Sequence, residues 1–210
     1  MSIRTDIAAE SFSQAGGAEK LQGVKVKNKV IENARLEATD ITIETQEASE
    51  KLGRPVGRYI TLTATDSTFD MYSDSFRERA EVIAKAIGEL CGGCERFLAV
   101  GLGNYALTSD AVGPLTAEKI FATRHIKSLA KEIDTEDLGE VTVIQTGVLG
   151  NTGIESSEQV KAIAERVRPQ AVIAVDALAC SELSNLGRTI QLCDTGISPG
   201  SGVENARKEL

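Results

Sequence analysis

Histidine, tryptophan and long apolar runs are scarce or missing in this sequence of 210 residues. It has one histidine, His125, and no tryptophan. A single histidine excludes metal sites built from several histidines, and a Ser-His-Asp or Cys-His catalytic set would have to use His125. Because His125 comes late in an expected helix, where the helix dipole favours a cation, we interpret it as a structural residue.

No apolar run is long enough to cross a bilayer, and the N-terminus lacks the apolar core of a signal peptide. We therefore expect a cytoplasmic protein whose four cysteines are reduced thiols. Two of them form Cys91-Gly-Gly-Cys94, which we interpret as a glycine-rich helix end, because zinc would need two more ligands with paired spacing. The net charge of −8 argues against binding to nucleic acid or anionic membranes.

Two buried strands that each end in an aspartate are the most informative feature that is present. Residues 97–100 are apolar without alternation, which is typical of a parallel strand, and a glycine-rich turn and polar loop then lead to Asp110. Residues 171–175 form a second such run, followed directly by Asp176. Since ligands of open α/β sheets bind at the carboxyl ends of the strands, we expect both aspartates at one crevice.

Two carboxylates that lie close together can act as the general acid and the general base of a hydrolysis reaction. Both cannot ionise cheaply, so one keeps a proton and polarises a carbonyl while the other takes a proton from water. The alternative is that each aspartate caps a helix or binds loop amides. A further alternative is that Asp110, Asp176 and a third carboxylate, Asp194, bind a hard cation.

Nucleotide cofactors are disfavoured by the same region. The segment Gly101-Leu-Gly-Asn-Tyr-Ala106 matches G-x-G-x-x-A, but a polar loop separates it from the next helix, and the following strand ends in Gln145-Thr-Gly147 without an acid for a ribose. No glycine-rich loop ends in Gly-Lys-Ser/Thr, which excludes a P-loop. We therefore expect no cofactor, and at the aspartates we prefer the acid–base pair over a resident metal.

The order of patterns along the chain predicts an α/β protein. Residues 1–22 look like a mobile leader, and residues 23–65 alternate as antiparallel strands with a turn at 51–57. From the capping box of Ser75 and Glu78 onward, helical and apolar patterns alternate. The expected fold has three layers: a mostly parallel central sheet with helices on both faces and an N-terminal antiparallel extension. Expected helices begin at 75, 114 (to about 130) and 156, and expected strands cover 96–101, 141–144, 171–175 and 189–193.

Several longer motifs resemble the germination proteases of spore-forming bacteria. They run in order from residue 3 to the end: Arg4-Thr-Asp-Ile-Ala8, Gly53-Arg-Pro-Val-Gly-Arg-Tyr-Ile-Thr61, Gly101-Leu-Gly-Asn104 with Thr108-Ser-Asp-Ala-Val-Gly-Pro114, Thr123-Arg-His125, Gly147-Val-Leu-Gly-Asn-Thr-Gly-Ile-Glu155, Val175-Asp-Ala-Leu-Ala179 and Asp194-Thr-Gly-Ile-Ser-Pro-Gly-Ser-Gly-Val203.

The resemblance implies an endopeptidase that starts the degradation of small acid-soluble spore proteins during germination. It also implies a zymogen that trims its own N-terminus, a homotetramer, location in the forespore or spore core, and a fold similar to that of hydrogenase-maturation proteases. The family's candidate catalytic aspartates fall on Asp110 and Asp176. The segment Thr5-Asp-Ile-Ala-Ala-Glu10 resembles the sequence that the family cuts, which predicts self-cleavage between Asp6 and Ile7.

Two departures from the family keep other interpretations open. Family chains continue past the Pro-Gly-Ser-Gly loop, so we expect residues 23–210 to be a single α/β peptidase domain truncated at its C-terminus. Tyr105-Ala-Leu107 also replaces the usual Trp-Asn-Val. The alternatives are an inactive homologue that only binds or oligomerises, and a metal-sensing peptidase of the hydrogenase-maturation type.

Overall fold

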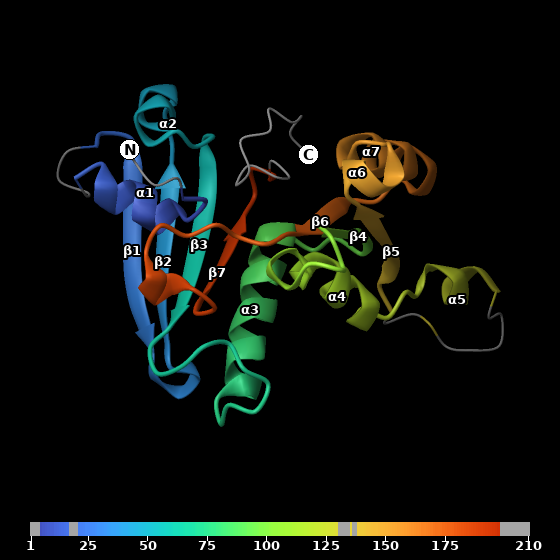
Figure 1. Ribbon diagram of the computed structural model, residues 1–210, viewed down its shortest axis with the longest axis horizontal. Coiled ribbons are helices and arrows are strands. Elements are labelled where there is room, and N and C mark those ends of the chain that lie inside the picture. The colour runs from blue at the N-terminus through green and yellow to red at the C-terminus, as the bar shows by residue number, and fades with distance from the viewer. Residues whose placement is uncertain (1–4, 17–20, 130–134, 136–137, 198–210) are drawn as a thin grey trace. The chain divides into compact units, whose positions relative to one another are not determined.

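The computed structural model describes residues 5–16, 21–129, 135 and 138–197 (Figure 1). It confirms the predicted α/β class. The chain divides into two compact units, one comprising Met1–Gly92 with Leu178–Thr195 and the other Gly93–Ala177 with the residues from Gly196 onward. The first unit contains a four-stranded antiparallel sheet and the second a three-stranded parallel sheet.

The sheet of the first unit has the strand order β1-β2-β3-β7. These strands are β1 (Val24–Ile31), β2 (Leu36–Ile43), β3 (Gly57–Ala64) and β7 (Thr189–Cys193). The three N-terminal strands are antiparallel, as the alternation of their apolar residues predicts. Strand β7 departs from the expected parallel pattern and pairs antiparallel with β3. The segment between β6 (Ala171–Val175) and β7 has only the 3-10 turn η4 (Leu183–Asn185), so no helical crossover returns the chain parallel to β6.

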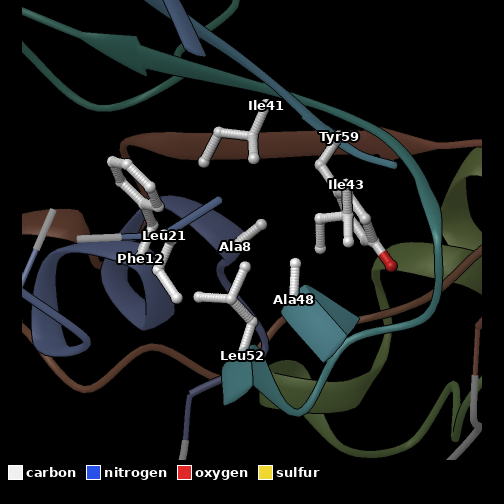
Figure 2. Close-up of a cluster of buried hydrophobic side chains, with 8 residues drawn as sticks. All are labelled: Ala8, Phe12, Leu21, Ile41, Ile43, Ala48, Leu52 and Tyr59. Atoms are coloured by element: carbon white, nitrogen blue, oxygen red, sulfur yellow. The ribbon is translucent and has the colours of Figure 1, made fainter. Parts of the chain in front are cut away.

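One face of this sheet is covered by α1 (Ala8–Gln14) and α2 (Gln46–Leu52). Figure 2 shows the buried cluster, in which apolar side chains of the two helices point toward those of β2 and β3. Helix α2 occupies part of the expected turn at 51–57; the Thr45 hydroxyl accepts a hydrogen bond from Ala48 N (3.3 Å), and Gly53 ends the helix with a positive φ. The cluster consists of Ala8, Phe12, Leu21, Ile41, Ile43, Ala48, Leu52 and Tyr59.

The opposite face is covered by α3 (Phe76–Cys91). Ala86 of this helix packs against Ile60 and Leu62 of β3, which alternate with the residues that face α1. The expected capping box is absent at its start: the Ser75 side chain makes no capping bond and instead contacts the Ser73 hydroxyl at 3.0 Å.

The parallel sheet of the second unit has the order β5-β4-β6, with β4 (Arg96–Leu102) in the centre and β5 (Glu140–Gly147) and β6 on either side. Leu98 and Val100 pack against Val160 of α7 (Ser156–Val167). Gly101 points to the other side, where a Cβ would lie 2.9 Å from the Ala117 Cβ of α4 (Val112–Lys119). Helices therefore cover both faces of this sheet, as predicted.

The single helix expected over residues 114–130 is divided into α4 and α5 (Arg124–Leu129). Between them, Thr123 pairs with the edge of β5: Thr123 N donates to Val141 O (3.0 Å), and Val141 N donates to the Thr123 hydroxyl (2.8 Å). These bonds are incompatible with a continuous helix. The remaining short elements are α6 (Leu149–Thr152), η2 (Glu32–Ala34) and η3 (Thr108–Asp110).

The expected leader, residues 1–22, is packed where the structure describes it. Ile7 and Ala8 are 1% and 3% exposed, and Phe12 joins the same core. The division into a leader and one domain from residue 23 stays a prediction. The Pro199-Gly-Ser-Gly202 loop and the expected C-terminal truncation lie outside the described residues. Within the described part of the chain, no helix is both long and apolar enough to cross a membrane.

Candidate functional site

The loop after β4 places Asp110 at the carboxyl end of that strand. Gly103 follows the strand with φ +109°, and a Cβ on it would lie 2.2 Å from Asp110 O. Asn104 N donates a hydrogen bond to Asp110 Oδ2 at 2.8 Å. The loop therefore folds back on itself, which only glycine permits at position 103, and holds the carboxylate of Asp110 against the strand end.

Short-range hydrogen bonds stiffen this loop. Leu107 N donates to Asn104 O at 3.1 Å, and Asp110 N donates to Leu107 O at 2.8 Å. The Asn104 side chain accepts a bond from Ala106 N at 3.0 Å. The carboxylate of Asp110 is thus carried by consecutive turns that are fixed by local contacts.

The start of α4 lies against the ends of two strands. A Cβ on Gly113 would be 2.1 Å from Leu102 O and 2.4 Å from Val175 O. Leu102 is the last residue of β4, and Val175 is the last residue of β6. The helix that follows Asp110 therefore contacts the residue directly before Asp176.

Asp176 follows the end of β6, and its Oδ1 accepts a hydrogen bond from Ala177 N at 2.9 Å. Gly101 and Val175 are register partners in the parallel ladder between β4 and β6. Asp110 and Asp176 thus follow the carboxyl ends of neighbouring strands of one sheet, which is the arrangement predicted from the apolar runs. Both are partly buried.

Residues that the sequence reasoning did not select also shape this edge. Gln145 Nε2 of β5 donates to Pro114 O at 3.2 Å and joins α4 to the third strand. Thr146 is 2% exposed, and its hydroxyl contacts the Ser156 hydroxyl at 3.0 Å. The only sequence signal for such positions is the glycine and proline around Asp110, because the contacts themselves are long-range.

Asp194 lies in the other unit, after β7. Its Oδ1 accepts a hydrogen bond from Arg58 N at 2.8 Å, and its own N donates to Arg58 O at 3.3 Å. These bonds extend the pairing of β3 and β7. The structure therefore shows a structural contact for Asp194, and its role as a third site carboxylate stays a prediction.

The Asp6–Ile7 bond is held by the amide of Gln191. Gln191 Nε2 donates to Asp6 O at 3.0 Å, and Gln191 Oε1 accepts from Ala8 N at 2.6 Å. Asp6 N also donates to Ala179 O at 2.8 Å, and Ala179 N donates to Asp6 Oδ2 at 3.2 Å. The predicted self-cleavage site is thus docked on residues of its own unit.

Glu10 is the one carboxylate of this segment that is almost entirely buried, at 7% exposure. It accepts hydrogen bonds from Ser181 N (2.8 Å), the Ser181 hydroxyl (2.5 Å) and Asn185 Nδ2 (2.6 Å). Burial raises the pKa of Glu10, but hydrogen bonds from Ser181, Thr5 and Asn185 outweigh it and lower the pKa to about 2. The sequence reasoning named Glu10 only as part of a cleavage-like motif.

Among the described residues, no three or more His, Cys, Asp or Glu side chains gather in a way that could hold a metal ion.

The comparisons with known proteins agree on one family. The family model described as germination protease matches residues 4–210. A germination protease of Clostridium tetani is 38% identical over 100% of this chain and 65% of its own length. Those of Oceanobacillus iheyensis and Bacillus cereus AH187 are 36% and 38% identical over 99% and 100% of this chain, and over 59% and 58% of their own lengths. The chain therefore spans less than two thirds of the length of these curated relatives.

Proposed function

Because the chain belongs to the germination protease family, we propose that it is an endopeptidase that starts the degradation of small acid-soluble spore proteins. The proposed catalytic residues are Asp110 and Asp176. One observation carries the assignment: the two aspartates follow the carboxyl ends of β4 and β6, which pair directly in one parallel sheet. That edge is where open α/β sheets bind their ligands.

In the proposed reaction, the ionised carboxylate of the pair takes a proton from water while the water oxygen attacks the peptide carbonyl carbon. The protonated partner donates its proton to the carbonyl oxygen, which gives a neutral tetrahedral intermediate. Collapse of this intermediate breaks the C–N bond: the carboxyl that gained the proton from water gives it to the leaving nitrogen. The other carboxylate takes its proton back from the hydroxyl as the new carboxylic acid forms.

Backbone N–H groups orient the two carboxylates for this reaction. Asp110 accepts a hydrogen bond from Asn104 N, and Asp176 accepts one from Ala177 N. Each bond restrains one carboxylate oxygen, so the carboxylates are held in place before a substrate binds. The proposal gives either aspartate the role of the base, since both are bound by a backbone N–H in the same way.

Replacement of each aspartate by asparagine tests the proposal. Asp110→Asn and Asp176→Asn should each lower the rate of cleavage of a small acid-soluble spore protein by about 10²- to 10⁴-fold, because an amide cannot transfer the proton. Circular dichroism should show an unchanged fold. Asp74→Asn is the matched control, since Asp74 is exposed in a turn of the other unit.

Cleavage at wild-type rates by both variants would refute the aspartate pair. A wild-type chain that binds the substrate without cutting it would support the alternative of an inactive homologue. Cleavage that requires added zinc or nickel would instead support a metal-sensing peptidase.

Two finer proposals rest on the family alone. We propose that the protein assembles as a homotetramer, which light scattering of the purified chain can measure. We also propose that it works in the spore core, which fluorescence microscopy of tagged protein in sporulating cells can check.

We further propose that the chain is a zymogen that cuts itself between Asp6 and Ile7. The segment from Thr5 to Glu10 resembles the family's cleavage sequence, which supports this proposal. Because Gln191 binds both sides of the bond and Ile7 is 1% exposed, the segment must first leave its docking site before any catalytic group can attack.

A further inference from the structure

We propose that Gly113 is a positioning residue for the aspartate pair. Its missing side chain lets α4 begin in contact with the ends of both β4 and β6, and this contact sets the separation of Asp110 and Asp176. The inference rests on the proposed function of the two aspartates. It adds a third residue to the site, one that carries no reactive group itself.

The space around Gly113 is limited by backbone atoms. A Cβ there would lie 2.1 Å from Leu102 O, 2.4 Å from Val175 O and 2.6 Å from Leu102 N. Ordinary contacts between heavy atoms are near 3.5–4.0 Å, so a methyl group could fit only after a displacement on the order of 1 Å. Leu102 and Val175 are strand-end residues that are still paired in the β4–β5 and β4–β6 ladders. Paired backbone cannot rotate away as a side chain can, so the start of α4 has to move.

Conformational strain does not explain a glycine at this position. Gly113 is not among the residues of the described chain with positive φ. Gly103, in contrast, has φ +109° and needs glycine for its backbone conformation as well. Gly113 is therefore needed because a residue without a side chain lets the helix approach the strand ends closely.

A displacement of the start of α4 should reach Asp110 but leave Asp176 in place. Asp110 lies three residues before Gly113 and is held on its other side by Asn104 N. Asp176 directly follows Val175, the last residue of β6, which pairs with Gly101 of β4. The methyl group of alanine at position 113 therefore pushes the Asp110 loop away from β6 and increases the distance between the two carboxylates.

Gly101 makes the same contact from the opposite side. A Cβ on Gly101 would lie 2.4 Å from Gly113 O and 2.7 Å from Gly113 C. Gly101→Ala is thus a second way to displace the start of α4. Gly88 and Gly150 have no heavy atom within 4 Å of an added Cβ, and neither has positive φ. Gly88→Ala, far from this site in sequence, serves as the matched control.

Crystal structures of the variants test the inference without relying on activity. The readout is the distance between the carboxyl carbons of Asp110 and Asp176. Gly113→Ala and Gly101→Ala should each increase this distance relative to the wild-type chain by on the order of 1 Å, which is the displacement that an added methyl group requires. Gly88→Ala should leave it unchanged. A loss of stability alone would not change this distance in a folded protein.

The outcomes separate this inference from the proposed function. If Asp110→Asn and Asp176→Asn cleave the substrate at wild-type rates, the aspartate pair itself is refuted. If those two variants are inactive but folded Gly113→Ala and Gly101→Ala keep the wild-type distance between the carboxyl carbons, the positioning role is refuted and the pair stands. If neither glycine variant folds, the glycines serve the core and the positioning role is likewise refuted. In cleavage assays the folded variants should lose about 10²-fold in kcat with KM retained.

Discussion

At the scale of the residue, Glu10 carries its charge in a place that water hardly reaches. Its carboxylate is surrounded by neutral donors from Ser181 and Asn185, which keep the pKa at about 2 although burial alone would raise it. An ordinary glutamate titrates near 4.5. Because the folded pKa lies below that of the unfolded chain, Glu10 stabilises the fold above about pH 4.5 and loses this contribution as the pH falls toward 2.

Replacing Glu10 by glutamine should remove this contribution. The difference between a pKa of 4.5 and one of about 2 corresponds to roughly 3–4 kcal/mol at neutral pH, so Glu10→Gln should lower the free energy of unfolding by up to that amount. The loss should shrink between pH 4.5 and pH 2. Urea unfolding at pH 7 and pH 3 measures both effects, and Glu37→Gln, at an exposed position of β2, is the control. A variant with wild-type stability at both pH values would contradict the assignment.

At the scale of the element, α3 is fixed to the sheet of its unit by one buried guanidinium. The Arg79 side chain is 2% exposed; Nε donates to Ala34 O at 3.1 Å, and Nη1 donates to Thr68 O at 3.2 Å. Its Nη2 also pairs with Asp66, and the guanidinium lies 5.5 Å from the centre of the Phe69 ring. Arg79 thus connects the helix to the turn before β2 and to the turn after β3, which lie at the same end of the pair because Leu36 and Ala64 are register partners.

Arg79→Met should destabilise the protein by on the order of 3 kcal/mol, because it leaves buried acceptors without a donor. Arg77→Met on the same helix is the control: Arg77 is 87% exposed, and its ion pair with Glu81 should contribute less than about 1 kcal/mol. Chemical denaturation of both variants measures the difference. Equal losses of stability in the two variants would show that the buried hydrogen bonds of Arg79 add nothing to the effect of removing one positive charge.

Prediction at this scale succeeded where the pattern is local. Alternation in residues 24–43 and 59–63 indicated antiparallel strands, and the apolar runs at 97–100 and 171–175 indicated parallel ones. It failed at residues 120–123, where Thr123 bonds to β5 and interrupts the expected helix. A helical pattern contains no information about a strand edge that competes for the same backbone groups.

At the scale of the whole molecule, the proposed self-cleavage makes the N-terminal segment a substrate of the aspartate pair. Incubation of the wild-type chain at mildly acid pH, where one carboxylate of a close pair is protonated, should remove Met1 to Asp6. Asp110→Asn should retain them. Gln191→Ala should lose them faster, because Gln191 binds both sides of the bond.

Intact mass against time measures this cleavage for the three chains. Equal loss in wild type and Asp110→Asn, or a cut at another bond, would refute self-cleavage by the pair. A Gln191→Ala variant that is cut no faster than the wild type would refute the protective role of the docked segment.

The sequence by itself determined the α/β class, the family and the positions of Asp110 and Asp176 at strand ends, because periodicity, apolar runs and motifs are properties of neighbouring residues. Only the tertiary structure decided that β7 pairs with β3, and that Asp194 consequently binds Arg58 of its own unit, which is not the unit of Asp110 and Asp176. It also decided that the Asp6–Ile7 bond is docked on Gln191 and that Gly113 meets two strand ends. Such contacts join residues far apart in the chain, and which of them form depends on how the packed core brings their backbones together.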